Sequence, residues 1–141
     1  MEKVLDRILI VEDDANLARI LKLYFEEKNV LCTFVENTKQ AMNWIENFNP
    51  HLIIIDIGLP DIDGIELAKQ IRKNIKTKKI PIIIITGKDE TELKIKSATE
   101  AHAELFLPKP FEPSTLWEAA SKLIENYKNA KFGSLFKHSF Q

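Results

Sequence analysis

The sequence has few of the features that mark several large classes of protein. It contains one cysteine, Cys32, so no disulfide can form within the chain, and the apolar residues around Cys32 predict a buried thiol rather than a reactive one. No apolar run approaches the roughly 18 residues of a membrane-spanning helix, and the N-terminus has no signal-peptide pattern. We therefore expect a cytoplasmic protein with no contact to a membrane.

Positive charge is not in excess either. Lysine and arginine number 20 against 21 aspartate and glutamate residues, which gives a net charge of -1. Proteins that bind nucleic acid through its phosphates need a basic surplus, so we expect no nucleic-acid binding by this chain. The glycine-rich signatures of dinucleotide-binding and P-loop folds are also absent, which disfavours a nucleotide-binding fold.

The 141 residues suit one domain, and a hydrophobic content of 45% is enough to fill its core. Five short apolar runs predict strands at 7–11, 31–36, 52–56, 80–85 and 104–107. Runs that are apolar at every position, such as 82–85, are typical of parallel strands covered on both faces. Helix-period segments lie between these runs, so the alternation predicts an α/β fold in three layers.

Each expected helix has apolar residues that recur with helical spacing. The inward-facing residues expected are Leu17, Ile20, Leu21 and Tyr24 in a helix over 15–28, then Ala41, Trp44, Ile45 and Phe48, then Leu67, Ala68, Ile71 and Ile75, and last Leu116, Ala119, Ala120, Leu123, Ile124 and Tyr127. The segment 91–101 is only weakly apolar, with Leu93, Ala98 and Ala101 as contacts, and is a candidate mobile element. Residues after Lys128 follow the last expected helix.

Acidic residues follow two of the expected strands. Asp56 ends the run 52–56, and Glu12, Asp13 and Asp14 follow the run 8–11. Ligand sites of open α/β sheets lie at the carboxyl ends of the strands, so these carboxylates are expected in one crevice. Clustered carboxylates suit a hard divalent cation, and Mg²⁺ takes one or two carboxylates together with phosphate oxygens. The pattern predicts Mg²⁺-assisted phosphoryl transfer with Asp56 as the acceptor.

Four strings at strand ends carry a family resemblance. Residues 10–14 read IVEDD, residues 55–64 read IDIGLPDIDG, residues 81–87 read PIIIITG and residues 107–111 read LPKPF. In this order and spacing they are similar to the receiver domains of response regulators in two-component signalling, including the chemotaxis regulators. The resemblance covers residues 5–128, and it leaves 129–141 as a C-terminal tail or the remnant of a linker.

The resemblance implies a flavodoxin-like (βα)5 fold with strand order 2-1-3-4-5. It implies a phosphorylation-dependent switch that takes a phosphoryl group on Asp56 from a histidine kinase or phosphotransfer protein. The signal then passes to a downstream protein through the fourth helix, fifth strand and fifth helix, and homodimerisation through that face is compatible with the family. Such a domain is no enzyme in the ordinary sense, because it assists only its own phosphorylation and dephosphorylation.

The resemblance also assigns roles to single residues. Asp13 and Asp56 would bind Mg²⁺ (or Mn²⁺), with Glu12 acting through a water and Gly58 through its backbone carbonyl. Lys109 would pair with Asp56 and later with the phosphate, while the Thr86 hydroxyl and the Gly87 N–H would bind phosphoryl oxygens. Thr86 and Phe106 would move inward as the switch, and the Lys109–Pro110 bond matches the family's cis peptide. Asp14 is expected to cap the first helix instead of binding metal.

Two departures from the family pattern and one variable position bear on these roles. His102 stands where receivers usually have a glycine, which is tolerable but more costly if the position needs a positive φ. Pro108 precedes Lys109 in place of the usual Thr or Ser, and removes no chemical group. Lys88 lies where side chains influence hydrolysis of the acyl phosphate, so we expect a long-lived phosphorylated state.

Two other functions remain open from the sequence. A phosphohydrolase with an aspartyl-phosphate intermediate would need a cap domain, for which there is no sequence, and a pseudo-receiver would have lost one of the residues Asp56, Asp13 or Lys109. The 61–64 segment (DIDG) is expected to be a turn and not a calcium loop. The three histidines, His51, His102 and His138, share no ligand spacing. The absence of a second domain favours a single-domain regulator, whose kinase and output the sequence does not name.

Overall fold

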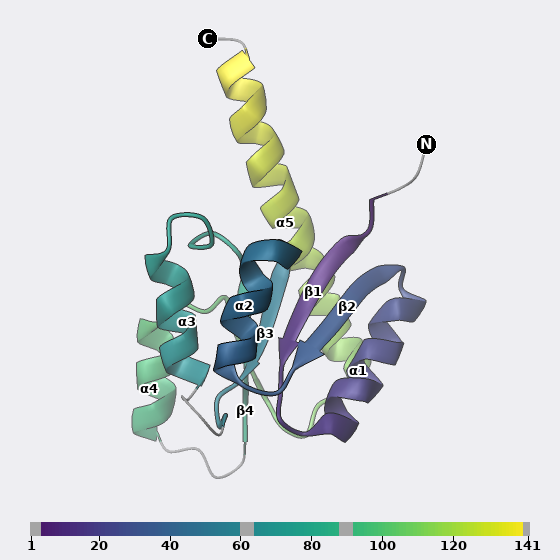
Figure 1. Cartoon of the computed structure of the whole chain (residues 1–141), viewed down its shortest axis with the longest axis vertical. Helices are drawn as coiled ribbons and strands as arrows, with labels where there is room; N and C mark the ends of the chain where they lie inside the picture. The colour runs from purple at the N-terminus through teal and green to yellow at the C-terminus, as the bar shows by residue number, and fades with distance from the viewer. Residues whose placement is uncertain (1–3, 60–63, 88–91, 140–141) are drawn as a thin grey trace.

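The computed structural model describes residues 4–59, 64–87 and 92–139, with the side chains of 93–95, 98 and 132–139 excepted. Its strands are β1 (Asp6–Val11), β2 (Val30–Val35), β3 (Leu52–Asp56), β4 (Ile82–Thr86) and β5 (Leu105–Pro108). Its helices are α1 (Ala15–Glu27), α2 (Thr38–Phe48), α3 (Gly64–Lys73), α4 (Glu92–Glu100) and α5 (Pro113–Ser139). Strands and helices alternate along the chain, as predicted (Figure 1).

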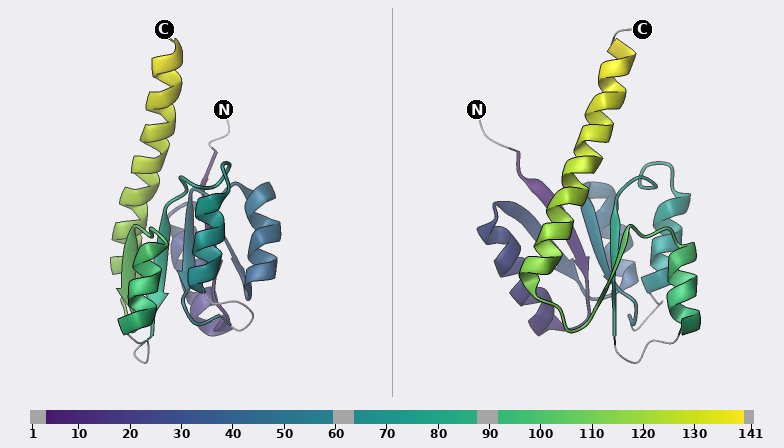
Figure 2. Two further views of the ribbon diagram at one scale, coloured as in Figure 1. Left: turned by 90° about the vertical axis from the view of Figure 1, so that its left-hand side faces the viewer. Right: turned by 180° about the vertical axis from the view of Figure 1, so that it is seen from behind.

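The strands form one parallel sheet in the order β2-β1-β3-β4-β5, which confirms the predicted topology. Successive side chains of a strand point to opposite faces, so each apolar strand supplies two cores. One core contains Leu9, Val11, Ile53, Ile55, Ile82 and Ile84 with α2 and α3, and the other contains Ile8, Ile10, Leu52, Ile54, Ile83 and Ile85 with α1 and α5. The fold is therefore a three-layer sandwich with the sheet in the middle (Figure 2).

Three residues expected in the core are exposed instead. Ile20 is 55% exposed because the buried stripe of α1 runs through Ala18, Leu21 and Phe25. Trp44 is 45% exposed on α2, where it packs edge-on against Phe48. Ile75 is 79% exposed because α3 ends at Lys73, two residues before it, so the helical spacing no longer applies. The expected contacts Leu93 and Ala98 are not among the described side chains, whereas Ala101 is buried.

The last helix was wrongly predicted to end before Lys128. It continues to Ser139 and projects past the edge of the sheet where the strands begin (Figure 1). The apolar repeat weakens after Tyr127 because the helix leaves the sheet surface there: residues 128–131 are all exposed. The interruption of the repeat at 128–131 therefore did not mark the end of the helix. The proposed boundary between a domain at 5–128 and a tail stays a prediction.

The connection from α4 to β5 is held by one arginine. His102 has a φ of 58°, the left-handed conformation that its sequence position suggested. The Arg72 guanidinium donates to the His102 carbonyl at 3.0 and 3.1 Å and to both oxygens of the Glu104 carboxylate at 2.8 and 2.9 Å. It also donates to the Ile80 carbonyl at 2.6 Å. One side chain thus joins α3 to the starts of β4 and β5, which no pattern in the sequence indicated.

Nothing in the described part of the chain forms a helix both long enough and apolar enough to cross a membrane.

Candidate functional site

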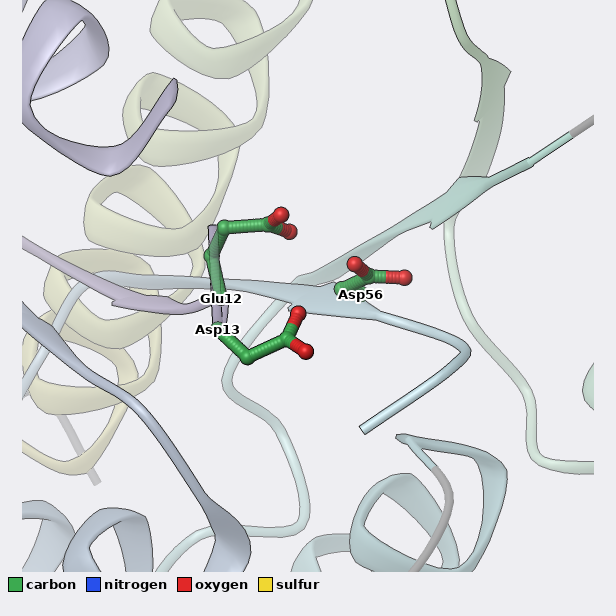
Figure 3. A group of neighbouring side chains, drawn as sticks. All are labelled: Glu12, Asp13 and Asp56. Atoms are coloured by element: carbon green, nitrogen blue, oxygen red, sulfur yellow. The ribbon is translucent and has the colours of Figure 1, made fainter. Parts of the chain in front are cut away.

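The candidate site lies where β1, β3 and β4 end. β1 and β3 are neighbours in the sheet, so Asp56 at the end of β3 lies beside Glu12 and Asp13, which follow β1. One oxygen from each of the three carboxyl groups lies within 4.8 Å of the others (Figure 3). The sequence placed these residues in one crevice on the strand pattern alone, and the structure brings them together.

A fourth group joins the cluster from the far edge of the sheet. The Lys109 ammonium lies 3.2 Å from Asp56 Oδ2 and 3.1 Å from Glu12 Oε1. Lys109 follows β5, and its backbone N–H donates to the Thr86 carbonyl at 2.7 Å. The peptide bond between Lys109 and Pro110 is cis, as the resemblance implied. The expected pairing of Lys109 with Asp56 is present, together with a bond to Glu12 that was not expected.

Asp56 is held as a carboxylate. Burial opposes its ionisation, but the interaction with the neighbouring Glu12, the hydrogen bond from the Gly58 N–H and the Lys109 ammonium outweigh burial and lower the pKa of Asp56. The Gly58 N–H donates to Asp56 Oδ1 at 3.0 Å. A carboxyl group kept ionised is what a nucleophile at this position requires.

The pKa of Glu12 is shifted in the opposite direction from that of Asp56. Glu12 is 1% exposed, and burial together with the neighbouring Asp56 raises its pKa to about 8. Its Oε1 binds Lys109, but its Oε2 is buried without a partner among the described residues. A buried oxygen without a partner is costly, which indicates that a further group binds here in the working state.

Both acids influence the pKa of Lys109. Burial alone would lower its pKa, but the hydrogen bonds and the attraction to Glu12 and Asp56 outweigh burial and raise it. Two buried acids thus share one cation. The atoms available for binding a cation here are all carboxylate oxygens, and one of them has no partner among the described residues. Such a set of ligands fits a hard divalent cation such as Mg²⁺.

The remaining residues predicted for the site lie around this cluster. Thr86 ends β4 and is 7% exposed; it directly follows Ile85, the register partner of Asp56. Phe106 lies in β5, partly buried against the core on the α3 side of the sheet. Asp14 is confirmed as the cap of α1, since its carboxylate accepts from the Asn16 and Leu17 N–H groups. Lys88 and the 61–63 part of the expected turn lie outside the described residues.

One important residue of the site was missed. Gly64 begins α3, and its N–H donates to the Ile57 carbonyl at 3.2 Å. A Cβ at this position would lie 2.6 Å from Ile55 Cγ2 and in contact with the backbone carbonyl of Asp56. A glycine at the start of a helix, where it weakens the helix, was the available signal. Gly64 allows α3 to approach the end of β3 closely and so helps to position Asp56.

Two other residues considered in the sequence, Cys32 and His51, have roles in packing and backbone hydrogen bonding. Cys32 is 1% exposed, and burial raises the pKa of its thiol to about 12, so it stays protonated and inert, as expected. His51 Nδ1 accepts from the Arg7 backbone N–H at 3.0 Å. Burial and the nearby Arg7 lower the pKa of His51, which keeps it neutral. Both residues have structural roles outside the site.

Comparison with known proteins agrees with this geometry. A family model described as the response regulator receiver domain matches residues 8–121. The chain is 38% identical over 109 residues to the phosphate regulon transcriptional regulatory protein PhoB of Pseudomonas aeruginosa, covering 77% of the chain and 47% of that protein. It is 36% identical over 107 residues to the transcriptional regulatory protein ResD of Bacillus subtilis, covering 76% and 43%. The chain spans about half the length of these curated relatives.

Solved structures show the same fold. A response regulator from Chloroflexus aurantiacus superposes with a TM-score of 0.80 at 31% identity, covering 86% of this chain and 99% of that one. A CheY-like receiver domain from Methanospirillum hungatei superposes with a TM-score of 0.83 at 26% identity, covering 90% and 99%. The resemblance inferred from the four strings is confirmed by both kinds of comparison.

Proposed function

Since the chain belongs to the response-regulator receiver domain family, we propose that it is a phosphorylation-dependent switch that accepts a phosphoryl group on Asp56. The observation that carries the proposal is the position of Asp56: its ionised carboxylate at the end of β3 lies 3.2 Å from the Lys109 ammonium and beside Glu12 and Asp13. These are the parts needed to attack a phosphoryl group and to balance its charge.

In the proposed reaction the donor is a phosphorylated histidine of a kinase or a phosphotransfer protein. An Asp56 oxygen attacks phosphorus, an O–P bond forms, and the P–N bond to the donor imidazole breaks with its electron pair left on nitrogen. Lys109, already 3.2 Å from Asp56, balances the negative charge that arrives with the phosphoryl group. The Thr86 hydroxyl and the Gly87 N–H would bind phosphoryl oxygens.

Asp13 and Asp56 would hold Mg²⁺ (or Mn²⁺) directly, with the Gly58 carbonyl as a third ligand and Glu12 acting through a water. The bound cation would neutralise charge on the phosphoryl oxygens. The buried, unpaired Glu12 oxygen supports this assignment, because a water bound to the cation would give it a partner.

The output follows from the same contacts. A phosphoryl group on Asp56 would draw Thr86 toward it, and Phe106 would rotate into the space that Thr86 leaves. Thr86 and Phe106 lie on adjacent strands, since Ile84 is the register partner of Phe106. The change would bias an existing equilibrium of the face made by α4, β5 and α5, which would then bind a downstream protein or a second copy.

Beryllofluoride, a stable stand-in for the phosphoryl group, provides the test. With Mg²⁺ present it should shift the amide resonances of the Thr86–Gly87 and Phe106–Lys109 segments in the wild-type protein. Asp56→Asn should show no such shift, because its neutral amide replaces the carboxylate that would bind beryllium. An unresponsive wild-type protein would exclude the proposal and leave a phosphorylation-independent binding module. Hydrolysis of small phosphate esters with turnover would instead indicate a phosphohydrolase.

A further inference from the structure

A concave surface lies away from the candidate site, at the end of the sheet where the strands begin. It is a groove of about 850 Å³ between the middle of α5 and the loop that joins α3 to β4. Its residues Pro81 and Glu104 come just before β4 and β5, whereas Asp56 and Thr86 are at strand ends. All five strands run in the same direction (Figure 1). The groove therefore lies where the strands begin, and the phosphorylation site lies where they end.

The floor of this α5 groove is apolar. Ile75, Pro81, Leu123 and Tyr127 line it, and Ile75 is 79% exposed. A single exposed isoleucine needs no explanation, but one that joins three further apolar side chains in a groove marks a candidate contact surface. α5 forms one side of the groove and supplies five of its lining residues, from Leu123 to Lys131.

The rim of the α5 groove is basic. Lys76, Lys78, Lys79 and Lys131 line it, and all four are exposed. None of these lysines forms an ion pair with a carboxylate in the described part of the chain. The acidic residue in the lining, Glu104, is already paired with Arg72 at 2.8 Å. The Lys131 ammonium lies over the Tyr127 ring, 5.0 Å from its centroid. Four positive charges without a carboxylate partner among the described residues therefore lie beside apolar side chains in a chain whose net charge is -1.

We propose that the α5 groove binds an acidic amphipathic helix of a partner protein. The apolar stripe of such a helix would cover Ile75, Leu123 and Tyr127, and acidic residues beside the stripe would face the four lysines. This is the usual way in which a helix lies in an apolar groove. Three of the lysines lie on one loop and the fourth on α5, so they can engage several separate carboxylates, whereas a ligand with a single charge would use one of them.

This docking surface is separate from the phosphorylation site. Its lining does not include Asp56, Lys109 or Glu12, nor the switch residues Thr86 and Phe106. α5 contributes both to the groove and to the proposed output face, but binding in the groove requires none of these five residues. The two proposals can fail independently, because one is read by beryllofluoride and the other by peptide binding.

The test uses the full chain and a labelled synthetic peptide of 18 residues with a leucine stripe at helical spacing and glutamate beside it. Fluorescence anisotropy should show binding that weakens about fivefold or more between 50 and 300 mM salt, since exposed charges are screened over this range. Lys76→Glu/Lys79→Glu should weaken binding at least tenfold, and so should Ile75→Asp. The matched control Lys28→Glu/Lys122→Glu makes the same charge change outside the groove and should change affinity less than twofold.

Two further peptides and three further measurements complete the experiment. A peptide with lysine in place of glutamate, and one with the same composition in scrambled order, should not bind. The groove variants should keep the wild-type circular dichroism spectrum and melting temperature, which shows that they are folded. Equal weakening in the control variant would overturn the proposal. So would binding only to phosphatidylglycerol vesicles, or groove-dependent self-association in sedimentation velocity, because the occupant would then be a membrane or a second copy.

Discussion

Glu12 makes a testable link between the site and the stability of the fold. It is 1% exposed, and burial with the adjacent Asp56 raises its pKa from 4.5 to about 8. A group whose pKa is raised in the folded state binds its proton more tightly there than in the unfolded chain. Its contribution to stability is therefore complete below pH 4.5 and is lost as the pH rises toward 8.

The size of the effect follows from that pKa. Between pH 5 and pH 8 the free energy of unfolding of the metal-free protein should fall by about 3–4 kcal/mol on account of Glu12. This is a large share of the roughly 5–15 kcal/mol that stabilises a typical domain. Glu12→Gln keeps the shape of the side chain and removes the ionisation, so the variant should gain about this much stability relative to wild type over the same pH range.

Urea unfolding with EDTA present, followed by circular dichroism at four pH values, measures this difference. Glu125→Gln, an exposed position on α5, controls for the loss of one negative charge. In an Asp56→Asn background the advantage of Glu12→Gln should shrink, because Asp56 is part of what raises the pKa of Glu12. Parallel stability curves for wild type and Glu12→Gln from pH 5 to 8 would refute the reasoning.

Three further predictions concern the framework around the site. Gly64→Ala should lower stability by about 1–3 kcal/mol in urea unfolding and shift the amide resonance of Asp56, because the added Cβ meets the Asp56 carbonyl; an unchanged resonance would contradict the proposed close approach. His102→Gly should raise stability by about 0.5–1 kcal/mol, since its φ of 58° suits glycine, and a loss of stability would argue against strain there. Arg72→Lys should lower the melting temperature and cost about 1–3 kcal/mol, because an ammonium cannot reach the His102 carbonyl and the Glu104 carboxylate together; a wild-type melting temperature would show that the bonds contribute little.

The sequence predicted the sheet and the meeting of the acidic residues correctly, because both depend on local patterns. Continuous apolar runs predict buried parallel strands, and acidic residues just after two runs lie together once the strands are neighbours. Helix packing was predicted less well. Helical spacing alone placed Ile20, Trp44 and Ile75 in the core, but all three are exposed. How wide the buried stripe of a helix is, and where the helix ends, depend on the elements that pack against it. The C-terminal end of α5 was predicted too early for the same reason. The apolar repeat indicates where a helix packs on the sheet, and α5 continues beyond that region to Ser139.

The sequence by itself determined the family, the strand order that the family implies and the residue types at the candidate site, because these follow from the spacing of motifs along the chain. Only the tertiary structure decided how the charges are shared. Lys109 is bonded to both Glu12 and Asp56, so one acid is kept ionised and the other protonated. The close approach of Gly64 to Asp56 and the basic groove beside α5 were also decided by the tertiary structure. Each depends on distances between segments far apart in the chain, which no local pattern records.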